Sequence, residues 1–385
     1  MNTSRTRRTT SAAAAAIVLA GIVTAAGPAA AATAPCTPDI VKLPGINSDS
    51  SGGGRLKDFG AGGLAVGSSA NLPVYWTSDR TAHAVPLPEG FQSGEVRAVN
   101  SKGLMVGTVE RSSDRAVAAF TYQQGAGAVQ LLNEGATGTV ASDVNDAGHV
   151  VGRDAGGPKE WLNGKVVREL PVPADAHPST EIISVAGINK RGDITGTAHS
   201  EYYDADNDQT ITKTFPVVWP AGGGYPPYSL QVWNEGHWSV GSHARDIDDR
   251  GRVVGVEHFS YRDDQRRTAA VWKKPYDALP TDPGKVSGYA HLELDAASPT
   301  TNVTVGTAVT FVEGYPNHIQ AAYWPGRGPA LALPHPAGAS KDSRSEASTA
   351  SDDDRVGGHF LDWNTGVSNA VIWTCASRQA YVPQA

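Results

Sequence analysis

Methionine is scarce in this chain, with 2 residues among 385, whereas glycine occurs 43 times and proline 25 times. Glycine and proline interrupt helices and are common in turns. This balance argues against a largely helical protein and favours an all-β fold with many turns. We expect almost no helix outside the N-terminal leader.

Long hydrophobic runs are lacking except near the N-terminus. Three arginines in the first ten residues precede an apolar run from Ala12 to Gly27, and the small residues Ala30 to Ala32 follow. This order is typical of a secretory signal peptide over residues 1–32. We therefore expect a secreted, extracellular protein without membrane insertion, whose residues 33–385 form one domain. The route of export, general secretory or twin-arginine, is left open.

Positive charge is also in deficit. The net charge at pH 7 is −7, and removal of the signal peptide takes away three arginines and no acids, which makes it −10. Proteins that bind nucleic acids present clustered lysine and arginine to the phosphates. A nucleic-acid partner is therefore not expected.

A repeated phrase is what the sequence does contain. The pattern Asn/Asp-x-x-Gly-x-Val-x-Gly recurs in seven copies 40 to 59 residues apart, with closing glycines Gly67, Gly107, Gly152, Gly196, Gly255, Gly306 and Gly357. Such a period indicates an array of equivalent small sheets. In the turn, Asn145 can bond the backbone two residues on, and Gly148 can take a positive φ. Each copy therefore predicts four short antiparallel strands.

The third predicted strand of nearly every copy ends in tryptophan. These residues are Trp76, Trp161, Trp219, Trp272, Trp324 and Trp373, with Phe120 and Tyr122 in the second copy. Because the ring recurs in almost every unit, we interpret it as packing between neighbouring sheets and not as a ligand contact.

A Leu-Pro tail predicts how the array closes. The pair Leu43-Pro44 precedes the first copy, whereas the last copy stops at Trp373 without a tail. An N-terminal strand that completes the last sheet would leave no exposed edge where the array begins and ends. The sequence thus predicts an all-β, seven-bladed β-propeller with four-stranded antiparallel blades.

The two cysteines lie where this closure would bring them together. Cys36 precedes the N-terminal strand, and Cys375 follows the last tryptophan by two residues. We expect a Cys36–Cys375 disulfide, since exported chains seldom keep free thiols. The alternative is two unpaired buried thiols.

The repeated phrase, with the Ala-Val/Phe-x-Trp segment that follows it, resembles the HAF repeat of extracellular bacterial proteins. The resemblance covers residues 36–377 and is weakest in the sixth and seventh copies, where Asp295-Ala296-Ala297-Ser298 and Ser351-Asp352-Asp353-Asp354-Arg355 replace the usual turn. It implies an exported protein built of propeller-like repeats. It implies little about activity, since a fold does not define a function.

Loops that vary on a repeated scaffold are the expected place for a binding site. We expect long loops between the second and third strands at 197–214, 256–267 and 307–319. Aromatic residues in or beside them could stack on sugar rings; these are Trp233, Trp238, Trp363, Tyr202, Tyr203, Tyr261 and Tyr315. The alternative is that these rings only pin the loops to the sheet edges.

An acidic run in the first of these loops is a candidate calcium site. Asp204, Asp206 and Asp208 alternate along the chain, a spacing that can direct oxygens to Ca²⁺. Gln209 stands where a calcium loop has glycine, and Phe215 where it has glutamate, so a solvated loop is the alternative. No other cofactor is expected.

Linear catalytic signatures are absent: the sequence has no Gly-x-Ser-x-Gly and no His-Glu-x-x-His. Carboxylates brought together at the axis of a ring would leave little trace in sequence. Asp143, Asp246 and Asp248 lie near inner strands, but we interpret them first as turn or strand-end residues.

The sequence therefore predicts a secreted, monomeric binding or interaction module for an extracellular glycan or protein. Two alternatives stay open. One is a polysaccharide-directed hydrolase or lyase, which would show convergent groups with raised pKa values in an axial pocket. The other is a structural surface protein, which would show no pocket.

Overall fold

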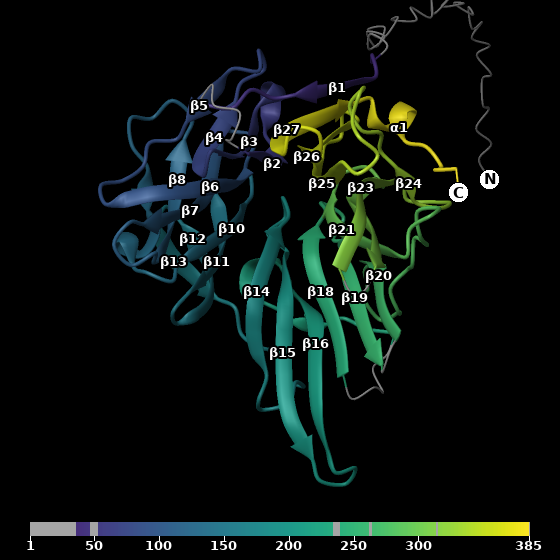
Figure 1. Ribbon diagram of the computed structural model, residues 1–385. Helices are drawn as coiled ribbons and strands as arrows, with labels where there is room; N and C mark the ends of the chain where they lie inside the picture. The colour runs from purple at the N-terminus through teal and green to yellow at the C-terminus, as the bar shows by residue number, and fades with distance from the viewer. Residues whose placement is uncertain (1–35, 47–52, 234–238, 262–263, 313–314, 385) are drawn as a thin grey trace, which may run out of the picture. The chain divides into compact units, whose positions relative to one another are not determined.

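The structure is a computed structural model that describes residues 36–46, 53–233, 239–261, 264–312 and 315–384. The predicted signal peptide lies outside these residues. The part described is all-β (Figure 1). Its only α-helix is the single turn α1 (Ala376–Gln379), and none of its helices has the length and apolar character needed to cross a membrane. Three short 3-10 turns complete the helical content, η1 (Ala61–Gly63), η2 (Leu132–Gly135) and η3 (Ala221–Gly223).

The strands form antiparallel sheets that follow the seven copies in order. Copies one to three each form a sheet of four. Their strands are β2 (Gly54–Phe59), β3 (Ala65–Ser69), β4 (Leu72–Trp76) and β5 (Ala82–Ala84); β6 (Phe91–Val99), β7 (Leu104–Arg111), β8 (Val117–Gln123) and β9 (Gln130–Leu131); and β10 (Val140–Val144), β11 (His149–Asp154), β12 (Gly157–Leu162) and β13 (Lys165–Glu169).

Copies four and five share one seven-stranded sheet, and copy six again forms a sheet of four. The shared sheet holds β14 (Glu181–Ile188), β15 (Ile194–Asp204), β16 (Gln209–Trp219), β17 (Tyr228–Ser229), β18 (Ser239–Ile247), β19 (Val253–Tyr261) and β20 (Asp264–Trp272). Copy six holds β21 (His291–Ala297), β22 (Thr304–Val312), β23 (Tyr315–Trp324) and β24 (Leu331–Ala332).

The N-terminal strand completes the last sheet, as predicted. Strand β1 (Asp39–Lys42) pairs antiparallel with β27 (Val367–Thr374), which continues to β26 (Arg355–Asp362) and β25 (Arg344–Ala350). The Leu43 amide extends this pairing by donating to the Ala370 carbonyl at 2.8 Å. The Cys36–Cys375 disulfide is present and fastens the same junction.

In their described residues, the expected long loops at 197–214, 256–267 and 307–319 are mostly strand, in β15 and β16, β19 and β20, and β22 and β23. β15 and β16 pair continuously from Ile194 and Trp219 out to Asp204 and Gln209, and their hairpin projects beyond the neighbouring strands in Figure 1. The segment alternates in polarity and carries β-branched residues, which favours a two-stranded ribbon over an irregular loop. Its outer half also pairs in parallel with β18, Thr212 opposite Ser239, and this pairing joins two sheets that the repeat pattern keeps apart.

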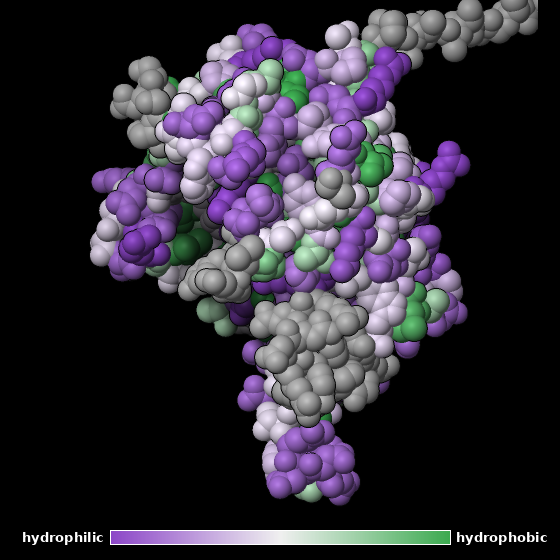
Figure 2. Space-filling view, turned by 45° about the vertical axis from the view of Figure 1, so that its right-hand side comes forward, coloured by the Kyte–Doolittle hydropathy of each residue, from purple (hydrophilic) through white to green (hydrophobic). Residues whose placement is uncertain are grey.

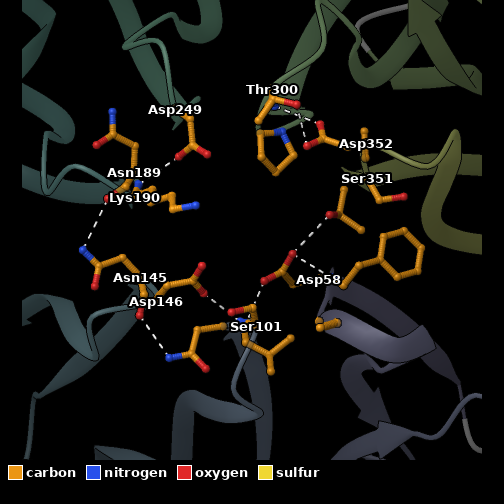
Figure 3. Close-up of a pocket in the computed structure, with 18 of the residues that line it drawn as sticks. Asp58, Ser101, Asn145, Asp146, Asn189, Lys190, Asp249, Thr300, Ser351 and Asp352 are labelled. Atoms are coloured by element: carbon orange, nitrogen blue, oxygen red, sulfur yellow. Dashed lines mark hydrogen bonds between the residues drawn. The ribbon is translucent and has the colours of Figure 1, made fainter. Parts of the chain in front are cut away.

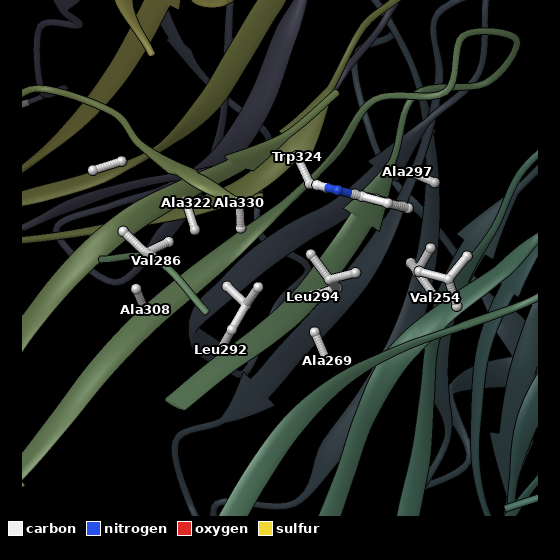
Figure 4. Packing of buried hydrophobic residues seen from close by; sticks show 12 residues of the cluster. Val254, Ala269, Val286, Leu292, Leu294, Ala297, Ala308, Ala322, Trp324 and Ala330 are labelled. Carbon is white, nitrogen blue, oxygen red and sulfur yellow. The ribbon is translucent and has the colours of Figure 1, made fainter. Parts of the chain in front are cut away.

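Seven clusters of buried hydrophobic residues lie between copies in the described part, six of them between copies consecutive in the chain and one between the last copy and the first. Figure 4 shows the cluster of copies five and six, where Val254 and Ala269 meet Leu292, Leu294 and Trp324. Another cluster joins the last sheet to the first through Val41, Leu43 and Ala370 against Leu56 and Trp76. The core of the described residues is therefore a series of sheet-to-sheet contacts in which the last meets the first.

The recurring tryptophans fill these contacts, as predicted. Trp161 and Trp373 are fully buried, and Trp76 is 1% exposed. The indole N–H of Trp76 donates to the Pro44 carbonyl at 2.8 Å, and that of Trp373 donates to the Pro334 carbonyl at 2.8 Å. In these two copies the ring packs between sheets while its indole N–H bonds the Leu-Pro tail of the preceding copy, so the buried donor is satisfied. Trp324 instead donates to the Gly328 carbonyl of its own copy.

The closing glycine of each copy faces a bulge in the first strand. Opposite Gly152 the register of β10 skips Ser142, and a Cβ built on Gly152 would lie 1.9 Å from the Val140 carbonyl oxygen. In the seventh copy this position belongs to Gly358, whose Cβ would lie 1.9 Å from the Glu346 oxygen, and not to Gly357 as the sequence suggested. The glycine is thus a steric requirement of the bulge.

This geometry gives the two neighbouring glycines of the seventh copy different tolerance to substitution. A Cβ on Gly357 would meet the side chains of Leu56, Phe59 and Thr349, which can shift, whereas a Cβ on Gly358 would meet backbone. We expect Gly358→Ala to lower the free energy of unfolding by about 3 kcal/mol or more, and Gly357→Ala by clearly less. Urea denaturation of both variants measures the difference. Equal losses would contradict the assignment of Gly358 to the bulge.

Candidate functional site

The residue that follows the bulge lines a central polar cavity of about 650 Å³ in copies one, three, five and seven. In copies one, three and five this residue is aspartate, namely Asp58, Asp143 and Asp246. In copies two, four and six it is small, namely Ala98, Gly187 and Ala296. In copy seven it is Thr349. Residues of all seven copies line the cavity.

Each of the three aspartates bonds two backbone amides from two sheets. One oxygen of Asp143 accepts the N–H of Val144 at 2.7 Å, and the other accepts the N–H of Ile188 in the next sheet at 2.7 Å. Asp58 bonds Phe59 and Val99 in the same way, and Asp246 bonds Ile247 and Ala297. A small residue in the neighbouring copy leaves room for the incoming carboxylate. Three carboxylates therefore accept backbone N–H groups at the first strands of six copies.

Burial raises the pKa values of all three acids, and for Asp58 and Asp143 a neighbouring carboxylate of the cavity adds to the rise. Burial raises the pKa of Asp58 to about 7, against the two amide bonds that lower it. Burial raises the pKa of Asp246 to about 6. The pKa of Asp143 lies well above its usual range, first because of burial and next because of the Asp246 carboxylate. The charged forms of the three groups oppose one another across the cavity.

Two of these carboxylates lie at the distance of a cooperating pair. A Cβ built on Gly187 would lie 3.0 Å from Asp246 Oδ1 and 3.5 Å from Asp143 Oδ2, so these two oxygens are at most about 6.5 Å apart. Any side chain at position 187 would crowd them. Because Gly187 has no side chain, one oxygen of each carboxylate can lie this close to its backbone.

The rim of the cavity consists of the turns that join first and second strands (Figure 3). Asn145 shows how the turn forms: its Oδ1 accepts the N–H groups of Ala147 and His149 at 3.1 Å each. Gly148 then turns the chain at φ 86°. The amide of the side chain remains free to donate outward, and it reaches the Asn189 carbonyl of the next copy at 3.3 Å.

A second set of bonds links these turns around the rim. Asp146 accepts the Ser101 N–H at 2.9 Å, Asp249 accepts the Lys190 N–H at 2.9 Å, and Asp352 accepts the Thr300 N–H at 2.8 Å. The residues of Figure 3 thus surround an open centre while they hold one another in place. The rim is preorganised, because its side chains are already positioned by neighbouring backbone.

The described aromatic residues among those predicted to bind sugars lie in different surroundings. Tyr202 lines a separate hollow of about 380 Å³, where its ring stacks on His177 at 3.9 Å between centroids. Tyr203 follows it on β15 and is 62% exposed. Trp233 packs against a core cluster, and its backbone N–H donates to Glu257 Oε1 at 2.8 Å. Trp363 is 54% exposed beside the Arg344 guanidinium.

The other three aromatic residues are only partly placed. Trp238 lies outside the described residues. Tyr261 ends β19 and Tyr315 begins β23, and their side chains lie outside the described part. The prediction of a shared aromatic surface therefore stays a prediction for these residues.

The candidate calcium ligands lie at the tip of the β15–β16 hairpin. Asp204 accepts bonds from the Asp206 N–H and the Asn207 side chain, and Asp208 accepts the Tyr203 hydroxyl. These carboxylates thus already bond within the hairpin. In the described part of the chain, no group of three or more histidine, cysteine or acidic residues is arranged to hold a metal ion. Calcium binding here stays a prediction.

The sequence pointed to two of the three cavity carboxylates. Asp143 and Asp246 were noted near inner strands, but Asp58 was missed, because its turn runs through Gly60–Gly63 and lacks the usual Asn or Asp. A signal was present, since an acid precedes an apolar residue at the same place in alternate copies. To recognise this pattern in the sequence, one must know where the bulge lies in each first strand.

Comparisons with known proteins add little. No family model matches the chain, and no curated protein matches it. Among solved structures, it is similar to a protein of Bacteroides ovatus described as a candidate glycoside hydrolase, with 9% identity and a TM-score of 0.26. That alignment covers 73% of this chain and 85% of the other.

The raised pKa values predict a specific dependence of stability on pH. A carboxyl whose pKa rises on folding stabilises the protein fully below pH 3.8, and this contribution is lost as pH rises through the folded pKa, about 6 for Asp246. We expect the stability of the wild type, relative to Asp246→Asn, to fall by up to about 3 kcal/mol between pH 4 and pH 8. Urea denaturation at both pH values tests this.

Asp352→Asn is the matched control. Bonds from Ser298 and Thr300 lower the pKa of Asp352 despite its partial burial, so its titration lies below pH 3.8. Its stability difference from the wild type should stay flat between pH 5 and pH 8. The lowered pKa values of histidines such as His243 and His359 affect both proteins alike and cancel. A flat difference for Asp246→Asn would contradict the expected titration.

Proposed function

We propose that this chain is a secreted seven-bladed β-propeller of the HAF-repeat type, which binds an extracellular glycan in the central cavity. The observation that carries the proposal is the cavity itself: one polar hollow to which all seven copies contribute residues. A closed ring is the arrangement that gives seven consecutive copies one common centre. The hydrophobic contact of the last sheet with the first supports the same arrangement.

Secretion is supported by the leader and by the disulfide. Residues 1–32 have the order of a signal peptide. The Cys36–Cys375 bond is of the kind that persists in oxidising compartments. Both features fit a protein that acts outside the cell.

The chemistry of the cavity favours a ligand rich in hydroxyl groups. Its lining offers the hydroxyls of Ser101 and Thr300 and the ammonium group of Lys190. Such groups donate to and accept from sugar hydroxyls. The volume of about 650 Å³ lies within the usual range of small-ligand sites. The hollow also argues against the purely structural alternative, which predicted no pocket.

Charge narrows the choice of glycan. Seven aspartates line the cavity against Lys190 and Arg355; they are Asp58, Asp143, Asp146, Asp246, Asp249, Asp352 and Asp353. Anionic groups would be repelled there, so the part of the glycan that enters the cavity is neutral or cationic. On the face shown in Figure 2, hydrophobic atoms form small separate patches in a mostly hydrophilic surface, which favours a polar ligand over a broad apolar partner.

Binding at the cavity can be tested by blocking its rim. We expect the mature protein to bind neutral oligosaccharides on a glycan array. Ser101→Trp, which places a large ring at the rim, should weaken that binding at least tenfold in calorimetry with the same oligosaccharide. Lys190→Ala should weaken it less, through loss of one donor. Lys102→Ala, a neighbour that does not line the cavity, is the control. Unchanged binding by Ser101→Trp would remove the cavity as the site.

Hydrolysis of the bound glycan is a second candidate function. The specific observation is the Asp143–Asp246 pair, two carboxyls beside Gly187 whose pKa values are both raised, that of Asp246 to about 6. A protonated carboxyl can protonate the glycosidic oxygen while a carboxylate activates water or attacks the sugar. The amide bonds to both groups equally support a purely structural role.

Turnover measurements separate these roles. We expect wild-type protein to release reducing ends from a glycan that it binds, and Asp143→Asn and Asp246→Asn to abolish the release while the fold persists by circular dichroism. Gly187→Ala, which crowds both carboxylates, should reduce turnover as well. Absence of turnover in the wild type, or retained turnover in both asparagine variants, would leave binding as the function.

A further inference from the structure

A second hollow, of about 840 Å³, lies between the first two copies and contains three arginines. Arg55 belongs to β2, Arg97 to β6, and Arg115 precedes β8. We call it the arginine groove. Asn71 and Ser93 also line it and add polar groups beside the guanidinium groups.

Two of the guanidinium groups are held in place through one edge only. Arg97 Nε donates to Glu95 at 2.9 Å, and Arg115 Nε donates to Glu110 at 2.9 Å. Within the described residues, the terminal Nη atoms of these two arginines make no hydrogen bond, and Arg55 makes no ion pair. Each glutamate therefore orients a guanidinium group and leaves its paired donors open, the edge that matches a carboxylate or phosphate.

The charge of the groove is opposite to that of the central cavity. Three arginines stand against Glu95 and Glu110 in the groove, whereas the whole chain carries −7. Lys57 adds a further cation, 3.7 Å from Glu95. An anionic ligand repelled by the acidic cavity would thus be attracted to the groove.

We propose that the arginine groove is a binding site for anionic groups, carboxylate or phosphate, of an extracellular polysaccharide. The identity of the carrier rests on the proposed glycan-binding function, whereas the anion site rests on the arginines alone. The groove would hold the charged part of a polymer whose uncharged part the central cavity accepts.

The test is calorimetric titration of the mature protein at low and high salt. Hexagalacturonate is the carboxylate probe, inorganic phosphate competes with it, and maltohexaose is the uncharged probe. We expect hexagalacturonate to bind at least tenfold more tightly at low salt than at 0.5 M salt, since exposed charges are screened. Competition by phosphate would assign the groove to phosphate-bearing polymers, and its absence would assign it to carboxylated ones; both outcomes support an anion site.

Variants locate the binding. The double variant Arg55→Gln and Arg115→Gln should weaken the binding of hexagalacturonate at least tenfold, without changing the affinity for maltohexaose. Arg80→Gln is the matched control, because Arg80, like Arg115, is an exposed arginine with positive φ but lies outside the groove. Glu110→Gln keeps an oxygen for Arg115 and removes a negative charge, so it should tighten hexagalacturonate binding. A purely structural role for these residues predicts no such gain.

Three results would overturn the proposal. They are an absence of hexagalacturonate binding by the wild type, wild-type affinity in the double variant, and an equal loss in Arg80→Gln. Failure of the glycan-binding function gives a different result. The protein would then bind neither maltohexaose nor the neutral glycans of the array, whether or not it binds hexagalacturonate in the groove.

Discussion

The fold depends on one close approach, in which a carbonyl group of the first strand lies where the side chain of the second strand would be. The bulge in the first strand produces this approach in every copy, and only glycine can stand opposite it. The bulge also shifts the side chain after it to the central cavity. A steric feature of the backbone thus places Asp58, Asp143 and Asp246 at one centre.

The three carboxylates combine two demands that conflict electrostatically. Each must accept amide hydrogens from two sheets, which favours the charged form, and each is surrounded by protein near the other two, which opposes it. Alternation with small residues resolves the steric part of this conflict for six copies. An odd number of copies cannot alternate completely, and Thr349 in the seventh meets Asp58 through a hydroxyl at 3.2 Å instead. A neutral neighbour there avoids a fourth buried carboxylate.

Charge divides the surface into two chemically distinct regions. The central cavity is acidic and polar, while the arginine groove gathers cations on the first two copies. Under the proposed function, a ligand that spans both regions must offer groups of different charge to them. Because salt screens exposed charges, binding at the arginine groove should depend more on salt concentration than binding at the central cavity.

The repeat period, the glycine and tryptophan positions and the partners at the chain ends were predictable from sequence. Each depends on a local pattern, and Leu43 beside Ala370 confirms the closure that the missing tail implied. Tertiary structure alone decided three features: Gly358 in place of Gly357, strands in place of the long loops, and the parallel pairing of Thr212 with Ser239. The reason is that bulges and strand edges depend on what lies across the sheet. The meeting of Asp58 with carboxylates far along the chain had the same cause, because it depends on how the sheets lie in space and not on any one copy.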